Sequence, residues 1–266
     1  MCWGSDWDGA LGNGARYSDY IGDGLDLDGY YYKDADDFDS ELGDALIAVD
    51  FGTVDGTNLT AKSLACGYVY TCALLSDDTI KCWGYNRKGD LGQGNTDAIG
   101  DEVGEMGDNL APVDLGTDSS GNNLTAKSMS CGLHHTCAVL SDATINCWGY
   151  NRKGDLGQGN TDAIGDEVGE MGDNLAPVNL GTNRTVLTVF IPSDGYSTCA
   201  LLDDYSLKCW GGRTGSGMLG NERAAYFDDY IGDGMEVMDN GDQVVTGVTE
   251  MGDNLVPVNL GTGRTV

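Results

Sequence analysis

The chain has 266 residues, of which 40% are hydrophobic, and it carries a formal net charge of −29. That hydrophobic content is sufficient for a folded core, and no apolar run approaches the roughly 20 residues that a membrane-spanning helix needs. Acidity spread over the whole length disfavours nucleic acid and anionic membranes as partners, because phosphate recognition needs clustered Lys and Arg. The acidity keeps a strand-rich chain soluble or attracts cationic partners.

Two short motifs recur and divide the chain into units. Cys-Trp-Gly begins at Cys2, Cys82, Cys147 and Cys209. Met-Gly-Asp-Asn-Leu begins at Met106, Met171 and Met251, with a degenerate copy at 42–46, and each copy is followed by a Val and a Gly-Thr pair. Residues 82–113 are identical in sequence to 147–178. We therefore expect one repeat array over 1–266, with units of approximately 2–81, 82–146, 147–208 and 209–266 that begin and end in mid-repeat.

Each central unit contains the pattern of three short strands. The first such set is Ala61 to Cys66, Thr71 to Leu75 and Thr79 to Trp83. A three-residue turn between the last two strands places Cys72 opposite Cys82, with one apolar face, whereas a two-residue turn would place Leu74 opposite Lys81. The pattern recurs at 126–131 with 137–147, and again at 199–209. The fold class predicted is all-β, with tandem antiparallel β-blade repeats in a β-propeller or an open propeller-like array.

This repeat resembles the regulator of chromosome condensation family. The family's blade couples a glycine, a Thr-Cys-Ala-Leu-like strand, a turn, a strand that ends in Trp-Gly, and then Gly-Gln-Leu-Gly. The last element appears here without its Gln, at residues 9–12, 89–92, 154–157 and 217–220. The resemblance implies a ring that typically has seven blades. Four units therefore predict a segment of a longer array, or a subunit that a neighbouring chain completes.

The cysteines of the hairpins have the same spacing in three units. The predicted pairs are Cys72 with Cys82, Cys137 with Cys147, and Cys199 with Cys209. Opposite positions in a hairpin suit a disulfide, which is favoured over buried free thiols, and zinc is disfavoured because two ligands per hairpin leave a site incomplete. Cys66 and Cys131 are predicted to be small core residues.

Three glycosylation sequons fall at the same phase of the repeat, at Asn58, Asn123 and Asn183. Such Asn-X-Thr sequons accept N-linked glycans on exposed loops of secreted proteins. Together with the predicted disulfides, they indicate an extracellular or cell-surface location.

Carboxylates recur in the long loop after each Trp. They are Asp97, Asp101, Glu102, Glu105 and Asp108, repeated as Asp162, Asp166, Glu167, Glu170 and Asp173, with a similar cluster at Asp23, Asp26 and Asp28. Oxygen ligands of this kind can hold calcium, but the spacing fits no EF-hand loop. Capping of turns by Asp and Asn explains most of the pattern, so calcium is the alternative, and no other cofactor is expected.

Candidate catalytic residues are few. His134 and His135 lie at a strand entry where other units carry different residues, so strand packing is favoured over general base catalysis. Residues 211–217 are glycine-rich but lack the Gly-Lys-Ser/Thr ending of a phosphate loop. The tryptophans of the repeat are predicted to anchor the blade cores, at Trp3, Trp83, Trp148 and Trp210.

The sequence therefore predicts a non-enzymatic extracellular structural or interaction protein, a disulfide-stapled and glycosylated β-repeat array. Its expected partners are proteins, in particular copies of itself or longer chains of the same array in a surface or fibrous assembly. The alternative, which the family resemblance permits, is a protein-binding propeller of the guanine-nucleotide-exchange or enzyme-inhibitor type. A hydrolase or lyase has no supporting residues.

Overall fold

The computed structural model describes residues 4–5, 7–12, 20–21, 48–192, 195–212, 219, 230–237, 243–245 and 250–261. The expectations for Cys2, Trp3, the Asp23, Asp26 and Asp28 cluster, most of the motif at 217–220 and the last residues lie outside this part of the chain. None of the described helices is long and apolar enough to cross a membrane.

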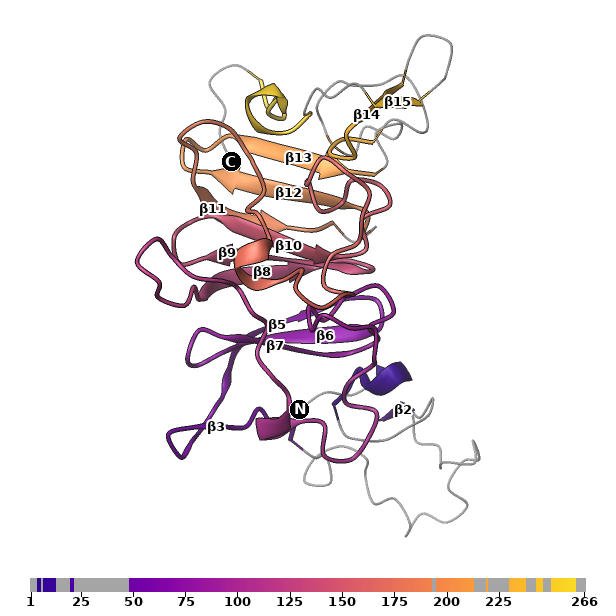
Figure 1. Cartoon of the computed structure of the whole chain (residues 1–266), viewed down its shortest axis with the longest axis vertical. Helices are drawn as coiled ribbons and strands as arrows, with labels where there is room; N and C mark the ends of the chain where they lie inside the picture. The colour runs from indigo at the N-terminus through magenta and orange to yellow at the C-terminus, as the bar shows by residue number, and fades with distance from the viewer. Residues whose placement is uncertain are drawn as a thin grey trace.

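Three antiparallel sheets of three strands form the centre of the molecule. The first contains β5 (Ala61–Cys66), β6 (Tyr70–Leu75) and β7 (Ile80–Gly84). The second contains β8 (Ala126–Cys131), β9 (His135–Leu140) and β10 (Ile145–Gly149), and the third contains β11 (Val186–Phe190), β12 (Ser197–Leu202) and β13 (Leu207–Gly211). In Figure 1 the three sheets follow one another along the long axis in chain order. The all-β prediction is confirmed.

The remaining elements of the described residues are short. Two-stranded pairs join β1 (Gly4–Ser5) to β2 (Tyr20–Ile21), β3 (Thr53–Val54) to β4 (Thr57–Asn58), and β14 (Met235–Val237) to β15 (Gln243–Val245). Single 3-10 turns are η1 (Trp7–Gly9), η3 (Gly107–Asn109), η4 (Gly172–Asn174) and η6 (Gly252–Asn254). The last three lie within the Met-Gly-Asp-Asn-Leu motifs.

The hairpin register follows the predicted turn length. Cys72 lies opposite Cys82 and Leu74 opposite Ile80, and the Leu75 amide donates to the Thr79 carbonyl at 2.9 Å, which leaves three residues in the turn. The structure bonds the three predicted cysteine pairs, Cys72–Cys82, Cys137–Cys147 and Cys199–Cys209.

The core lies between the sheets. Every residue of β6 and β9 is buried, because each central strand is covered by a neighbouring sheet and by loops. One cluster joins Leu74 and Ile80 of the first sheet to Leu140 and Trp148 of the second. The tryptophans predicted as anchors, Trp83, Trp148 and Trp210, are fully buried.

The prediction for Cys66 is wrong, because this residue is exposed, while Cys131 is half-buried. The Cys131 sulfur lies 3.8 Å from Thr136 Oγ1, and burial raises the pKa of its thiol to about 12. The difference arises from stacking. β8 packs on the first sheet, whereas no three-stranded sheet of the described residues lies on the corresponding side of β5.

The two recurrent loop motifs hold one another. The carboxylate of Asp108 accepts the Thr53 amide at 2.6 Å, Asp173 accepts that of Thr117 at 2.7 Å, and Asp253 accepts that of Thr182 at 2.8 Å. The Gly-Thr pair and the Met-Gly-Asp-Asn-Leu motif therefore close each blade from its two ends, across 55 to 71 residues of sequence.

Candidate functional site

Each described Gly-x-Leu-Gly turn contacts the three-stranded sheet that follows it through one backbone carbonyl. We call these contacts the first, second and third junctions, in chain order. The Ala10 carbonyl accepts hydrogen bonds from Thr71 Oγ1 and Trp83 Nε1, both at 3.0 Å. The Asp90 carbonyl does the same for Thr136 and Trp148, and the Asp155 carbonyl for Thr198 and Trp210, at 3.0–3.3 Å. The repeated Thr and Trp are thus the groups that attach a hairpin to the preceding turn.

Close packing at these junctions requires glycine. Gly89 has a φ of +76°, and a Cβ there would lie 2.5 Å from the Asp166 nitrogen of the next unit. A side chain at this position would force the two units apart. The long acidic loop of each unit is therefore seated directly on the preceding turn.

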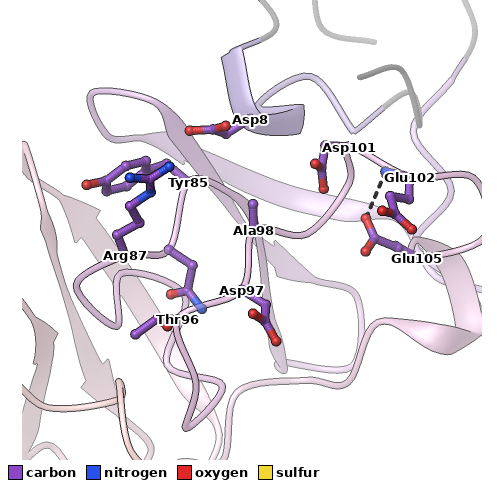
Figure 2. A pocket seen from close by; sticks show the side chains of 10 residues that line it. Asp8, Tyr85, Arg87, Thr96, Asp97, Ala98, Asp101, Glu102 and Glu105 are labelled. Atoms are coloured by element: carbon purple, nitrogen blue, oxygen red, sulfur yellow. Dashed lines mark hydrogen bonds between the residues drawn. The ribbon is translucent and has the colours of Figure 1, made fainter. Parts of the chain in front are cut away.

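A cavity of about 470 Å³ lies at the first junction. It is lined by Asp8, Tyr85, Asn86, Arg87, Thr96, Asp97, Ala98, Asp101, Glu102 and Glu105. Figure 2 shows Asp8, which comes from the preceding turn, above the loop that carries the other four carboxylates, with Tyr85 and Arg87 to one side. Five carboxylates and one guanidinium make this a strongly acidic pocket.

Glu105 shapes the loop from within. Its Oε2 accepts the amides of Gly100 at 2.8 Å and Glu102 at 2.9 Å, and burial raises the pKa of its carboxyl group. Glu170 holds Gly165 and Glu167 in the same way in the next unit. Turn capping was predicted for Asp and Asn side chains; in this loop Asn95 accepts the Asp97 amide in that way, while Glu105 and Glu170 hold further amides that the prediction did not include.

The predicted calcium ligands separate in space. Asp97, Asp101, Glu102 and Glu105 line the pocket, whereas Asp108 binds Thr53 in the blade closure, as Asp173 binds Thr117. In the described residues no group of three or more His, Cys, Asp or Glu side chains is placed to hold a metal ion. Calcium binding stays a prediction for these loops.

At the second junction, the preceding turn places a positive charge opposite the acidic loop, whereas at the first junction it places a negative charge there. Six residues after the first Cys-Trp-Gly begins stands Asp8, whereas the equivalent position in the next copy is Lys88. The Lys88 ammonium group lies 5.7 Å from the centroid of the Tyr150 ring, which is the counterpart of Tyr85. Burial, and then the carboxylates of Asp90 and Asp8 among nearby charges, raise the pKa of Tyr85. Because the loops at 82–113 and 147–178 are identical, the charge that each loop meets from the preceding turn differs between the two junctions.

Sequence reasoning missed two buried carboxyl groups. Asp90 and Asp155 occupy the place of the absent Gln in the Gly-Gln-Leu-Gly element, and both are almost completely buried. The Oδ1 atom of Asp90 lies 3.2 Å from His134 Nδ1, while burial raises the pKa of the Asp90 carboxyl group. Burial raises the pKa of Asp155 to about 7. The departure from the family pattern was the signal that could have identified them.

The histidines contact neighbouring sheets. His135 is buried, its Nε2 lies 3.0 Å from Thr198 Oγ1, and burial lowers its pKa to about 3, so the ring is neutral at physiological pH. His134 pairs with Asp90 in the turn that follows the first sheet. Both contacts join one sheet to the next, in keeping with the predicted packing role.

The three sequons lie on the surface. Asn58, Asn123 and Asn183 are all exposed, and each precedes the first strand of a three-stranded sheet. Their positions are those expected of glycan acceptors, and the modification itself stays a prediction.

Known proteins similar to this chain share its repeat. Two regulator of chromosome condensation (RCC1) repeat profiles match, one at residues 61–90 and 126–155 and the other at 78–139. The ultraviolet-B receptor UVR8 of Arabidopsis thaliana is 29% identical over 128 residues, which cover 47% of this chain and 26% of the receptor. The mitochondrial RCC1 domain-containing protein RUG3 of Arabidopsis thaliana is 24% identical over 158 residues, which cover 59% of this chain and 30% of that protein.

Among solved structures, Prp20p from Saccharomyces cerevisiae superimposes with a TM-score of 0.47 at 17% identity, over 81% of this chain and 41% of that one. The chain thus spans less than half the length of each of these proteins.

Proposed function

We propose, from the premise that this chain carries RCC1 repeats, that it acts as a non-enzymatic protein-interaction module. The observation that carries the proposal is the acidic pocket at the first junction, which recruits cationic side chains of a protein partner. Loops held on a rigid scaffold are where binding residues of β-repeat proteins concentrate.

The pocket is preorganised for such a partner. Glu105 fixes the backbone of the loop, and the Asn86 side chain donates to the Asn95 carbonyl at 2.9 Å. Little conformational freedom is therefore lost when a ligand binds. The volume of about 470 Å³ suits one long side chain with its flanking backbone.

Charge selects the partner. Five carboxylates around one guanidinium favour a Lys or Arg side chain, and the Tyr85 ring adds an aromatic wall against which such a cation can pack. Carboxylates at the rim also attract a cationic partner over a distance set by the ionic strength.

A charge exchange between the two junctions tests this role. A labelled oligolysine peptide is titrated against the wild-type protein and against the Asp8→Lys variant, which gives the first junction the charge of the second. We expect at least a tenfold loss of affinity, and we expect Lys88→Asp to raise the number of bound peptides from one to two.

Asp162→Lys is the matched control. It changes the net charge by the same amount but lies at the second junction, so affinity for the first pocket should stay within twofold of wild type. An equal loss of affinity in Asp162→Lys and Asp8→Lys would show that peptide binding depends on net charge alone. The pocket would then be rejected as the binding site. An oligoglutamate peptide of equal length should not bind.

An extracellular or cell-surface location completes the proposal. Three disulfides within hairpins and three exposed sequons at one phase of the repeat support it, since disulfides persist in oxidising compartments. The test is the intact mass of native material before and after reduction and deglycosylation. Free thiols at the hairpin cysteines together with unmodified asparagines would refute this location.

The finer proposal is assembly with copies of the same array. The support is that unit meets unit through the same Thr and Trp hydrogen bonds at three successive junctions, a contact that is chemically repeatable. Analytical ultracentrifugation over a hundredfold range of concentration would test it, and a concentration-independent monomer would exclude it. An exchange-factor or inhibitor role is the alternative that uses the same protein-binding surface.

A further inference from the structure

Two junctions with identical turns differ in the partner of one buried carboxyl group. Asp90 and Asp155 follow the same sequence, and each offers its backbone carbonyl to the Trp of the next sheet. Opposite Asp90 stands His134, whose Nδ1 lies 3.2 Å from Asp90 Oδ1. The residue equivalent to His134 in the third sheet is Tyr196, two positions before the Thr that contacts the turn.

Among the described residues, no ion pair joins Asp155 as His134 joins Asp90. Its residue is 1% exposed, and its Oδ1 atom is buried with no hydrogen-bond partner. The other oxygen, Oδ2, accepts the backbone amide of Lys153 at 3.3 Å. A buried carboxylate with one unsatisfied oxygen is costly when charged and much less so when protonated.

The surrounding groups do not neutralise it. The Lys153 ammonium group lies over the Tyr196 ring, 4.1 Å from its centroid, and 5.8 Å from that of Tyr230. The neighbouring loop contributes another buried acid, because Asp233 lies beside Gly154 of the turn. The Gly212 backbone amide lowers the pKa of the Asp155 carboxyl group by less than burial raises it, and the Trp210 indole donates to the backbone carbonyl of Asp155.

We propose that the junction between the second and third sheets is a pH-sensitive joint, in which protonation of Asp155 holds the third sheet in place and ionisation loosens it. The carbonyl of the same residue accepts Thr198 Oγ1 at 3.0 Å and Trp210 Nε1 at 3.1 Å. A movement of the charged side chain toward water therefore disturbs the two hydrogen bonds that attach β12 and β13. This joint is independent of the partner proposed for the first junction.

The direction of the pH effect follows from burial. Burial raises the pKa of Asp155 to about 7, whereas an Asp in an unfolded chain titrates near 4. The Lys153 amide and ammonium group lower the pKa by less. The folded state thus holds a proton that the open state releases. Stability at this joint is complete below about pH 4 and is lost as the pH rises to about 7.

Hydrogen exchange of the backbone amides of β12 and β13 tests the joint. After correction for the intrinsic exchange rate, the opening constant should rise by up to tenfold per pH unit between pH 5 and about 7, then level off. In Asp155→Asn, a neutral isostere, this rise should be absent.

Asp90→Asn is the matched control, because it makes the same change at the second copy of the turn. It should leave the pH dependence of β12 and β13 unchanged. Tyr196→His supplies the partner that Asp90 already has, and it should flatten the rise without altering the turn, so the proposal stays testable even if Asp155→Asn does not fold. A wild-type pH dependence in both Asp155→Asn and Tyr196→His would overturn it.

Discussion

At the residue scale, one position of the repeat carries different side chains opposite the same two backbone carbonyls. Lys81 is buried and donates to the carbonyls of Phe51 at 3.0 Å and Gly107 at 2.8 Å. Lys208 does the same for Leu180 and Gly252. The equivalent residue of the second sheet is Asn146, which is too short for both carbonyls and whose buried Oδ1 has no partner. Burial lowers the pKa of both lysines, but the carbonyls compensate for the lost hydration.

Replacing Asn146 with Lys should therefore stabilise the protein. A charge-assisted donor would reach the counterpart carbonyls of Leu115 and Gly172 and remove the unsatisfied amide, so we expect the free energy of unfolding to rise by about 1–2 kcal/mol. Urea denaturation of Asn146→Lys measures it. The reverse change, Lys81→Asn, should cost a similar amount, and a destabilised Asn146→Lys would show that the second sheet has no room for the ammonium group.

At the element scale, the hairpin is the unit that the chain repeats most faithfully. Cys72, Cys137 and Cys199 are each joined to a cysteine ten residues later, directly across the strand pair. The cysteines of the first two pairs are fully buried and belong to the clusters between sheets. The disulfide therefore both closes the hairpin and fills the core.

Removing one disulfide should destabilise the fold without changing its topology. For a closed loop of this length we expect the Cys137→Ser, Cys147→Ser double variant to lose about 2–3 kcal/mol of unfolding free energy, since the unfolded chain regains the freedom of the open loop. Urea denaturation with and without reductant checks this. Cys66→Ser, at an exposed free thiol, should stay within about 0.5 kcal/mol of wild type. A loss that persists unchanged after reduction of all three bonds would argue against the hairpin disulfide as its cause.

At the scale of the whole molecule, stability depends on how well each sheet is attached to its neighbour. Tyr70 is buried in the first sheet, and its hydroxyl donates to the His135 carbonyl of the second at 2.6 Å while it accepts from Thr136 at 3.1 Å. Burial raises the pKa of Tyr70 well above its usual value, so the hydroxyl stays a neutral donor throughout the physiological range. Such contacts couple units that would otherwise unfold separately.

The Tyr70→Phe variant should weaken that coupling. It removes one of the two hydrogen bonds that the His135 carbonyl accepts, the other coming from the Gly132 amide, and we expect a loss of about 1–2 kcal/mol together with a broader unfolding transition. Calorimetry reports both quantities. A transition as sharp as that of the wild type would mean that the apolar core between the sheets couples them by itself.

Much of the fold could be read from the sequence because the hairpin is a local structure. Alternation of apolar residues with a period of two, together with the length of the turn, determines the register, and the register determines which cysteines meet. The strand bounds of 61–66 and 126–131 were predicted as the structure has them. Turn capping by Asp and Asn followed in the same way, since Asp77 and Asn95 accept amides only two residues away.

Tertiary structure alone decided what happens at the junctions. Asp8 and Lys88 face identical loops, and Asp90 lies 44 residues from the His134 that pairs with it, so neither relation appears in any local pattern. The exposure of Cys66 and the burial of Cys131 likewise depend on which sheet stacks on which strand. The physical reason is that backbone pairing and turn chemistry operate within about ten residues, whereas the charge, burial and pKa of a junction side chain depend on the neighbouring unit packed against it.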